Sequence, residues 1–348
     1  MESRNILLYG LNWLGDSVMA MPALRRLIDT HPANRFTMLV KPTLQPLWQM
    51  FPGLANVRPL RSGLRGLAQT VLQLRREHWH AAYVLQHSSR SAITTTCAGI
   101  PDRIGTRGHE LWPLLTRAVP LPPDPHHHQS LEYASLFDIS FNGVQPMPPR
   151  LEIPREAEQA ANAVVDGPGP LLALIPGAAR GPSKRWPSRA FAAAGRRLAE
   201  ETGARCVILG SSGDSAICRS TCDAIGPPAI DLAGRTTLPE LAALLRRCRV
   251  AITNDSGGMH LAAAMGTPVV AVFGMTDPRR TGPLGSGHRI VCAEGFRPSR
   301  NIRRNSTKAR RALESIAPER VVREALDVFR ALSQADDDRP RAHALARP

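Results

Sequence analysis

Short apolar runs that alternate with helical stretches are the feature that most restricts what this chain can fold into. Residues 5–10 (NILLYG) have the character of a buried strand, and residues 36–40 and 81–85 are further runs of the same kind. Helical stretches lie between them, at about 17–29 and at 64–76. Parallel strands need long crossover connections, usually helices, which then cover both faces of the sheet. The first half of the chain is therefore expected to form a parallel α/β sheet.

The same alternation restarts after two proline-rich stretches, at 120–128 and 142–154. Proline cannot donate to a sheet ladder or continue a helix, so these stretches are expected to be connections, with a domain boundary near 145–168. The second half predicts strands at 171–175, 206–209, 249–253 and 269–273 and helices at 188–202, 214–225, 238–248, 260–265 and 318–332. Two such halves predict two Rossmann-like domains that face a cleft.

The length of 348 residues agrees with two domains. We expect a first domain over 1–155, a second over 168–316 and a C-terminal helix over 317–333. The remaining residues, 334–348, are polar and contain proline, so they are expected to be disordered.

The charge of the chain indicates anionic partners. Lys and Arg total 44 against 29 Asp and Glu, a formal net charge of +15, which suits nucleic acid, phosphorylated small molecules or an anionic membrane surface. No apolar run approaches the roughly 20 residues of a membrane-spanning helix. The first residues lack the three regions of a signal peptide. The six cysteines include no Cys-x-x-Cys pair, which favours a reducing, cytoplasmic setting.

The first motif, residues 10–17 (GLNWLGDS), lies where the first strand ends and the first helix begins. Doubly wound sheets bind ligands at this edge. Asp16 has two interpretations there: a helix N-cap, with Ser17 as a competing cap, or a carboxylate that acts as a general base. The pattern alone favours the cap. The spacing is not Gly-x-Gly-x-x-Gly, so a dinucleotide fingerprint is not expected.

The second motif, residues 176–187 (PGAARGPSKRWP), follows the first strand of the second half. Two glycines, a serine and several basic residues predict an anion-binding loop, in which Lys184 acts as a point charge on phosphate. It is not a Walker A loop, because arginine follows Lys184. A solvated surface loop is the alternative, and Trp186 argues against it because a tryptophan here is expected to anchor the loop to a core.

The third motif, residues 253–260 (TNDSGGMH), stands between a strand and an alanine-rich helix. A glycine pair at a helix N-terminus offers free N–H groups and the positive end of the helix dipole to a phosphate. Asp255 and His260 are candidates to bind sugar hydroxyls or phosphate. The alternatives are an N-cap for Asp255 or Ser256 and a packed, hydrogen-bonded role for His260.

Four further segments carry weaker signals. Residues 210–214 (GSSGD) form another strand-to-helix loop that is expected to line the same cleft. The histidines at 126–128 are not expected to converge on one metal ion, and the aspartates at 336–338 lie in the predicted tail. The basic segment 289–311 is interpreted first as a solvated face and second as a surface for phosphate-rich lipid headgroups.

Taken in order, the motifs resemble the bacterial lipopolysaccharide heptosyltransferases of glycosyltransferase family 9, from about residue 5 to residue 332. The segments that carry the resemblance are 13–16 (WLGD), 98–105 (AGIPDRIG), 176–178 (PGA) leading to 184–187 (KRWP), 231–234 (DLAG), 253–260 and 316–319 (IAPE). Each is weak alone, and the ordered set is specific. The KRWP loop and the Asn-Asp-Ser-Gly segment look most like the enzymes that add the second inner-core heptose.

The resemblance implies a GT-B fold, with the acceptor on the N-terminal domain and the donor ADP-heptose on the C-terminal one. It implies inversion at the anomeric carbon with no cofactor and no required metal. By position, Asp16 matches the general base, which reverses the preference for a cap, and Lys184 matches a catalytic contact to the donor phosphates. The donor-binding residues that the resemblance implies are Gly177, Ala178, Lys184, Gly210, Ser211, Thr236, Asp255, Ser256, Gly257, Gly258 and His260.

The implied acceptor is Kdo-lipid A that already bears a heptose on its inner core. Ser88, Arg90, Arg103 and Arg107 are the candidates to meet acceptor phosphates or carboxylates. The resemblance also implies peripheral contact with the cytoplasmic face of the inner membrane. Ala178 and Ala179 stand where relatives often carry more polar or acidic residues, which leaves the sugar contacts there open. Transfer of another heptose or another sugar also stays open.

Two hypotheses from other functional classes compete with the hypothesis that the chain is an enzyme. The charge alone suits a nucleic-acid-binding protein, but the basic stretches lack a recognisable reader motif or interleaved aromatic residues, so no nucleic acid is expected. The other hypothesis is a relative of the family that has lost catalysis and only binds nucleotide. The presence of both Asp16 and Lys184 argues against it.

Overall fold

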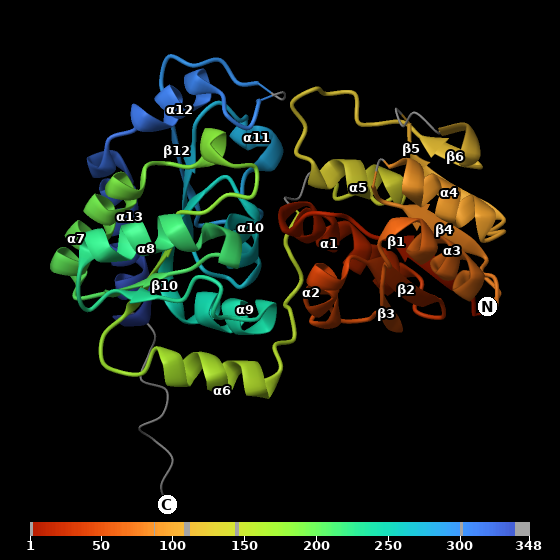
Figure 1. Cartoon of the computed structure of the whole chain (residues 1–348), viewed down its shortest axis with the longest axis horizontal. Helices are drawn as coiled ribbons and strands as arrows, with labels where there is room; N and C mark the ends of the chain where they lie inside the picture. Colours follow the sequence, from red (N-terminus) through yellow and green to blue (C-terminus); the bar gives the residue numbers. More distant parts are fainter. Residues whose placement is uncertain (1–2, 87, 108–111, 143–145, 300–301, 338–348) are drawn as a thin grey trace, which may run out of the picture. The chain divides into compact units, whose positions relative to one another are not determined.

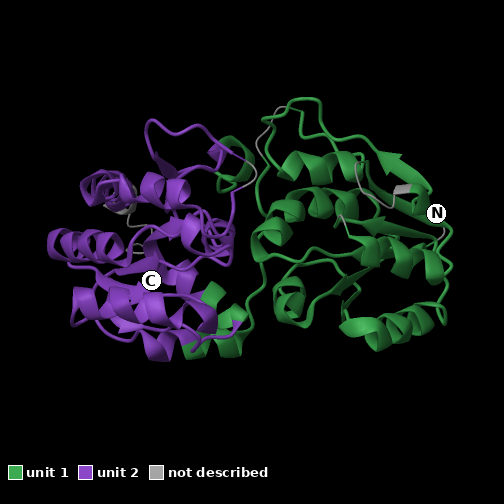
Figure 2. Ribbon diagram, turned by 45° about the horizontal axis from the view of Figure 1, so that its top comes forward, with its two compact units in different colours: residues 1–160, 238–242, 279–285 green, residues 161–237, 243–278, 286–348 purple. Residues whose placement is uncertain are grey.

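The computed structural model describes residues 3–86, 88–107, 112–142, 146–299 and 302–337, and it divides into two compact units (Figures 1 and 2). Unit 1 holds residues 1–160, 238–242 and 279–285, and unit 2 holds 161–237, 243–278 and 286–348. Each unit is built on its own six-stranded sheet. The division between residues 160 and 161 falls within helix α6 (Arg155–Val164).

The sheet of unit 1 is parallel throughout, in the order β3-β2-β1-β4-β5-β6. Its strands are β1 (Asn5–Tyr9), β2 (Arg35–Val40), β3 (Asn56–Pro59), β4 (Ala81–Val84), β5 (Asp102–Thr106) and β6 (Arg117–Val119). The helices are α1 (Leu14–Thr30), α2 (Gln45–Gln49), α3 (Gly63–Leu74), α4 (Ser89–Cys97) and α5 (Ser130–Leu136). Because β1 pairs with both β2 and β4, the strand order reverses beside β1.

The sheet of unit 2 is also parallel, in the order β12-β11-β10-β7-β8-β9. Its strands are β7 (Leu171–Ile175), β8 (Arg205–Ile208), β9 (Ile230–Asp231), β10 (Cys248–Asn254), β11 (Val269–Phe273) and β12 (Arg289–Cys292). The helices are α7 (Ser188–Thr202), α8 (Ser215–Ile225), α9 (Leu238–Arg247), α10 (Gly257–Ala264), α11 (Pro278–Thr281), α12 (Thr307–Glu314) and α13 (Pro318–Asp337). Here the order reverses between β7 and β10.

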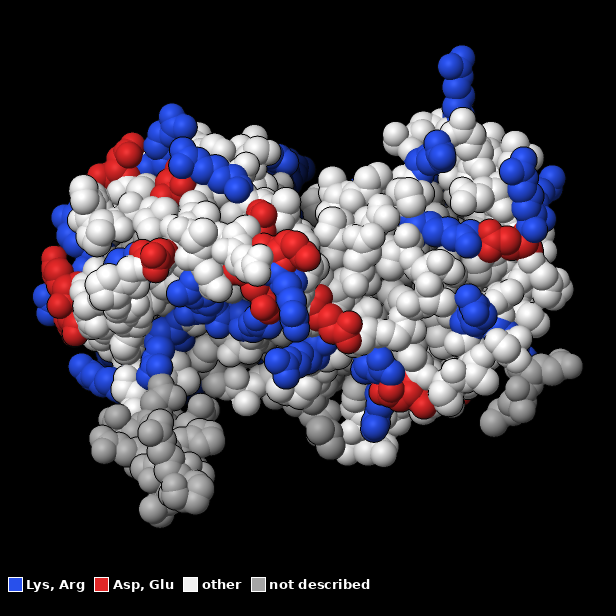
Figure 3. Space-filling model, turned by 90° about the horizontal axis from the view of Figure 1, so that it is seen from below, with Lys and Arg blue, Asp and Glu red and all other residues white. Residues whose placement is uncertain are grey.

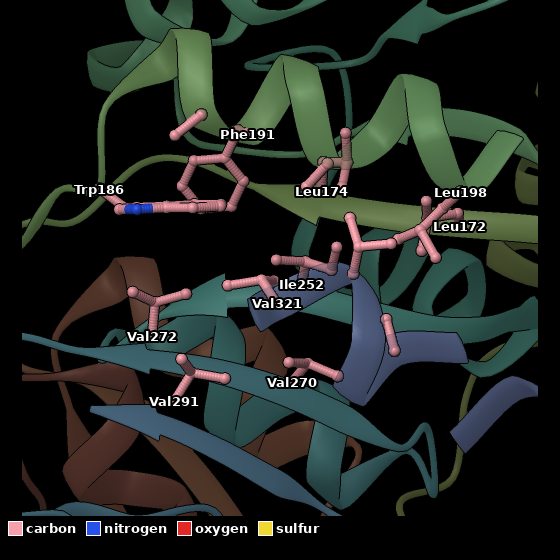
Figure 4. Close-up of a cluster of buried hydrophobic side chains, with 14 of the residues drawn as sticks. Leu172, Leu174, Trp186, Phe191, Leu198, Ile252, Val270, Val272, Val291 and Val321 are labelled. Atoms are coloured by element: carbon pink, nitrogen blue, oxygen red, sulfur yellow. The ribbon is translucent and has the colours of Figure 1, made fainter. Parts of the chain in front are cut away.

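The core of unit 2 shows why its central strands are continuous apolar runs. Every residue of β7 and β11 is buried, as expected for strands covered on both faces. Trp186 is fully buried against Phe191, with the rings edge to face and their centroids 5.0 Å apart (Figure 4). Its indole N–H donates to the carbonyl of Ile316 at 3.0 Å. The tryptophan of the second motif therefore anchors its loop to the core, as predicted.

The prediction of two Rossmann-like parallel sheets is confirmed, and three local predictions are corrected. Helix α1 begins at Leu14 with Trp13 at the cap position, so neither Asp16 nor Ser17 caps it. Helix α13 continues to Asp337, so residues 334–337 of the expected tail are helical, and 338–348 lie outside the described residues. The edge strands β3, β6, β9 and β12, which are short and partly exposed, were not predicted.

Candidate functional site

The loops that follow β7 and β10 meet at the reversal of strand order in unit 2. The carboxyl ends of adjacent parallel strands lie at one edge of a sheet, and ligands of open α/β sheets bind at this edge beside the reversal. The loop after β7 carries the second motif and passes through the 3₁₀ turn Pro182–Lys184. The loop after β10 carries Asp255 and Ser256 and leads directly into α10. The fold therefore brings the second and third motifs together, although Lys184 and Asp255 in them are 71 positions apart in the sequence.

Asn254, the last residue of β10, ties these two loops to each other. Its side chain is fully buried. The amide nitrogen donates to the carbonyl of Pro176 at 2.8 Å, and the amide oxygen accepts from the backbone N–H of Trp186, also at 2.8 Å. One side chain thus fixes both ends of the second motif. Asn254 was not predicted as a site residue, because its position in the third motif does not show where its amide points.

Lys184 and Asp255 form an ion pair at the centre of this arrangement. The Lys184 Nζ lies 2.6 Å from Asp255 Oδ2. The Asp255 side chain is 7% exposed and the Lys184 side chain 16%. Both were predicted as separate contacts to a donor, one to phosphate and one to sugar. The structure brings them within one hydrogen bond, so the ammonium that would meet a phosphate is positioned by the carboxylate.

A second ion pair holds the other side of the loop after β7. The guanidinium of Arg185 donates to Asp214 at 2.9 Å, and Asp214 also accepts from the hydroxyl of Ser211 at 2.6 Å. Gly177 lies directly against this carboxylate, because a Cβ added to Gly177 would stand 2.3 Å from the carboxyl carbon of Asp214. Gly177 and Ser211 were predicted as donor-site residues, but the Asp214 carboxylate that both contact was not.

Ser183 connects the same loop to the basic segment that precedes α12. It is buried, and its hydroxyl donates to the carbonyls of Arg303 and Arg304 at 2.6 and 2.7 Å and accepts from the backbone N–H of Ser306 at 2.8 Å. Gly181 has a φ of +88°, and a Cβ there would meet the side chain of Arg304 at 2.9 Å. Part of the basic segment is therefore held against the loop rather than free in solvent.

The N-terminus of α10 is the arrangement best suited to an anion. Ser256 stands at the cap position without capping the helix through its side chain. Its hydroxyl oxygen, like that of Thr253, is buried with no hydrogen-bond partner in the described part of the chain. Gly258 lets the helix approach β7, because a Cβ there would meet Ile175 at 2.9 Å. Exposed helix N–H groups and the helix dipole favour a phosphate at such a position.

The remaining predicted donor residues lie along the same edge of the sheet. Ala178 is buried in the loop after β7, and Gly210 follows β8, with Cys218 too close to admit a side chain at that glycine. Thr236 lies half-buried in the loop between β9 and α9, and His260 is buried on α10. The fold therefore places all of these positions after the carboxyl ends of β7, β8, β9 and β10.

Asp16 lies in unit 1, in the first turn of α1, after the carboxyl end of β1. An acidic residue here is favourably placed toward the positive end of the helix dipole. Its carboxylate accepts from the side-chain amide of Gln129 at 3.4 Å. The same amide nitrogen donates to the hydroxyl of Tyr133 at 3.0 Å. Asp16 is half-buried, so its side chain is held by neighbouring residues and is still accessible to solvent.

The four acceptor candidates have different surroundings. Ser88 caps α4 by accepting from the backbone N–H of Ser91, and Arg103 donates to the carbonyls of Leu114 and Ile100 at 2.8 and 2.6 Å. Arg90 donates to the carbonyls of Gly63 and Arg61 at 3.1 and 2.5 Å. Arg107 is exposed. Three of the candidates therefore already make contacts within the protein, and any binding of the acceptor by these side chains has to be compatible with those contacts.

The histidines at 126–128 serve the packing of unit 1. His128 donates from Nε2 to the carbonyl of Gly282 at 3.0 Å, and burial lowers its pKa. His127 Nε2 lies 2.9 Å from Glu132, which also accepts from Arg280 at 2.9 Å. Among the described residues no group of three His, Cys, Asp or Glu side chains is arranged to hold a metal ion.

The basic side chains do not form one uninterrupted surface. On the face shown in Figure 3, Lys and Arg side chains are spread over both units, with Asp and Glu side chains between them. In the described part of the segment 289–311, exposed basic residues cluster at Arg303, Arg304, Lys308, Arg310 and Arg311. None of the helices in the described ranges is both long and apolar enough to cross a membrane.

Several known proteins similar to this chain belong to one family. Residues 68–310 match the sequence profile of glycosyltransferase family 9 (heptosyltransferase). Lipopolysaccharide heptosyltransferase 2 of Salmonella typhimurium is 30% identical over 92% of this chain and 97% of its own length. The structure of E. coli ADP-heptose lps heptosyltransferase II matches with a TM-score of 0.81 and 26% identity, over 96% of this chain and 100% of that one. E. coli heptosyltransferase WaaC with ADP shares the fold, with a TM-score of 0.72 and 17% identity over 93% and 99%.

Proposed function

The chain belongs to glycosyltransferase family 9, and from this premise we propose that it transfers a heptose from ADP-heptose to the heptose-bearing inner core of lipopolysaccharide, the activity of a heptosyltransferase II. The observation that carries the proposal is the meeting of Lys184, Asp255 and the N-terminus of α10 at the strand reversal of unit 2. These groups suit a sugar joined to a diphosphate, because they combine a cation, a helix N-terminus and a carboxylate for hydroxyl groups.

The donor diphosphate is proposed to bind across the loops after β7 and β10. The N–H groups of Gly257 and Gly258 and the Ser256 hydroxyl would donate to one phosphate, and Lys184 would approach the other. Asp255 would accept from hydroxyl groups of the sugar. The buried hydroxyl of Ser256 supports this placement, since a polar atom without a partner in the described chain is expected to gain one from a ligand.

The transfer step is proposed to be a single displacement with inversion. Asp16 takes the proton from the acceptor hydroxyl as that oxygen attacks the anomeric carbon of the donor heptose. The new carbon–oxygen bond forms while the bond between the anomeric carbon and the phosphate oxygen breaks, and its electron pair leaves with ADP. A single carboxylate serves this chemistry because it acts as a base and forms no covalent intermediate.

The negative charge that develops on ADP is proposed to be stabilised by protein groups. Lys184 and the N–H groups at the start of α10 are oriented before the reaction, so they act without reorganising as the charge appears. In this proposal the reaction needs no metal and no cofactor. The Lys184–Asp255 ion pair supports the assignment, since it holds the ammonium in one position.

The acceptor is proposed to bind to unit 1, where Arg107 is the exposed candidate to meet its phosphates or carboxylates. Because that acceptor is a lipid, we also propose peripheral contact with the cytoplasmic face of the inner membrane. The exposed basic residues around α12 support such contact. Co-sedimentation with vesicles that contain anionic lipid, compared with neutral vesicles, tests it. Equal recovery with both would contradict it.

Release of ADP from ADP-heptose tests the proposed function directly. Two acceptors are offered, one with a heptose-free inner core and one with a single heptose. We expect turnover only with the heptose-bearing acceptor. Turnover with the heptose-free acceptor would instead assign addition of the first heptose. The absence of both turnover and ADP binding would contradict the proposal.

A further inference from the structure

We propose that Gln129 is a positioning residue for the reaction, which orients the carboxylate of Asp16 through its side-chain amide, with Tyr133 fixing that amide in turn. The inference rests on the proposed role of Asp16 as the base. Gln129 lies at the cap position of α5, more than 100 residues from Asp16 in sequence. Nothing in the motifs around Asp16 points to it.

The direction of the contacts is set by chemistry. An ionised carboxylate only accepts hydrogen bonds, so the amide nitrogen of Gln129, and not its oxygen, faces Asp16. That nitrogen carries two hydrogens, and it has two acceptors at hand: Asp16 Oδ1 at 3.4 Å and the Tyr133 oxygen at 3.0 Å. The shorter contact to Tyr133 holds the amide, and the longer one to Asp16 leaves room for the carboxylate to bind a substrate hydroxyl. Hydrogen bonds around catalytic groups are often long without substrate and tighten in the complex.

Tyr133 is suited to hold the amide because it stays neutral. Its side chain is 5% exposed, and burial first and then the negative charge of Asp16 raise its pKa well above the usual value. The phenol therefore keeps its proton at every pH at which the reaction would run. Its oxygen accepts from Gln129 without adding a charge beside Asp16.

The turn that carries Gln129 is held by the segment Arg279–Gly285, which belongs to the same unit. The N–H of Gln129 donates to the carbonyl of Arg280 at 2.9 Å, and His128 donates to that of Gly282 at 3.0 Å. The side chain of Gln129 therefore extends from a tethered turn. This rigidity is what a positioning residue needs, because a loosely held amide would not restrict the carboxylate.

A neutral donor suits a base better than a cation would. An N–H donor keeps a carboxylate ionised and oriented, whereas a full positive charge beside it would make it a weaker base. On α5, Glu132 is paired with Arg280 and His127, and burial raises the pKa of Tyr133. The Gln129 amide contacts Asp16 without adding a charge.

Three substitutions and a control test the inference with the ADP-release assay. Gln129→Leu removes the donor with little change in size, Gln129→Glu keeps the shape and adds a carboxylate, and Tyr133→Phe removes the group that holds the amide. Gln73 on α3 receives the same changes, Gln73→Leu and Gln73→Glu, as a control in the same unit. It lies in the last turn of α3, which points toward the amino edge of the sheet, opposite to Asp16.

We expect Gln129→Leu to lower kcat about 10- to 100-fold with the KM for ADP-heptose unchanged, the effect of losing a hydrogen bond to a charged group. The acid limb of the pH profile of kcat should move to higher pH, because a carboxylate that loses a donor is harder to keep ionised. Gln129→Glu should move that limb further, since it places a second carboxylate beside the first. Tyr133→Phe should lower kcat by less, and the Gln73 variants should match the unsubstituted chain.

Asp16→Asn separates the inference from the proposed function. If this variant keeps full activity, Asp16 is not the base and both proposals are overturned. If Asp16→Asn is inactive while Gln129→Glu and Gln129→Leu keep the unsubstituted kcat and acid limb, only the positioning role is overturned. Gln129→Glu preserves the shape of the side chain, and thermal unfolding checks that each variant is folded. A variant with normal kcat at every pH contradicts the inference even if its stability falls.

Discussion

The pairing of Lys184 with Asp255 gives each residue two tasks. Asp255 orients the ammonium before any ligand arrives, and the 7% exposure of its side chain means that its charge relies on Lys184 for compensation. A buried ion pair is weak support for stability, but loss of one partner leaves the other charge uncompensated. We therefore expect stability and donor binding to depend on the same contact, and changing the residues singly and together separates the two effects.

Lys184→Met should lower the free energy of unfolding by about 2 kcal/mol, less than the roughly 3–5 kcal/mol of a fully buried pair, because the lysine is partly exposed. Combining it with Asp255→Asn should restore most of that stability, since no uncompensated charge remains. The KM for ADP-heptose should stay raised, about 10-fold or more, in both variants. Urea denaturation and donor titration measure the two effects. A double variant with normal donor KM would remove the role of Lys184.

Asp16 should be required for transfer and not for donor binding, because its proposed partner is the acceptor hydroxyl and it lies in unit 1. Asp16→Asn keeps the size of the side chain and removes the base, so kcat should fall about 10²- to 10⁴-fold. The affinity for ADP should stay within about twofold of the original, as measured by calorimetric titration. Substantial activity in Asp16→Asn would assign the proton to another group.

At the scale of elements, the site depends on two loops that a single side chain joins. Asn254 accepts from the N–H of Trp186 and donates to the carbonyl of Pro176, so its amide satisfies buried groups at both ends of the second motif. A buried carbonyl that loses its donor keeps the full desolvation penalty. Loss of the Asn254 hydrogen bonds should therefore also disturb the position of Lys184, which lies two residues before Trp186.

Asn254→Asp should keep the acceptor and lose the donor, and it should place a negative charge against the carbonyl of Pro176. We expect a loss of about 2–3 kcal/mol in unfolding free energy together with weaker ADP binding. Asn162→Asp on α6 is the matched control, because Asn162 accepts from Arg247 at the surface and loses nothing by becoming a carboxylate. Denaturation and ADP titration compare the two. Equal behaviour of the variants would mean that Asn254 does not organise the loops.

The sequence predicted the elements with strong local signals and missed those that depend on distant partners. The central strands β1, β2, β4, β7, β8, β10 and β11 were predicted, because strands buried on both faces are continuous apolar runs. The edge strand β3 has no buried residue and leaves no such signal. Trp13 lacks a capping side chain, which explains why the start of α1 was placed too late.

The site was predicted in its residues but not in its contacts. The glycines, Lys184 and Asp255 stand in motifs with recognisable chemistry, whereas the ion pair between them joins residues 71 positions apart. The side chains that support the site, Asn254 and Asp214, are common polar types at the end of a strand and in the turn before a helix. Their roles depend on which distant residues the fold brings beside them, and a single sequence does not show this.

At the scale of the whole molecule, the proposed donor-binding residues and the proposed base belong to different compact units. Unit 2 contains every predicted donor-binding residue, and unit 1 contains Asp16, Gln129 and the acceptor candidates. Each unit has its own sheet and its own buried cluster. A nucleotide that binds only the folded form of unit 2 should therefore stabilise that unit by mass action, without requiring any change in unit 1.

ADP should slow amide hydrogen exchange in unit 2 alone. At about 100 times its dissociation constant it should add roughly 2.7 kcal/mol to the stability of the binding-competent form. The protection should concentrate in peptides that cover residues 176–187 and 254–264, while peptides from α1 and α5 exchange as before. Adenosine is the matched control, and it should protect far less because Lys184 and the α10 N-terminus act on phosphate. Equal protection by adenosine would mean that the protein recognises the nucleoside rather than the diphosphate. Protection confined to unit 1 would contradict the assignment of the donor site.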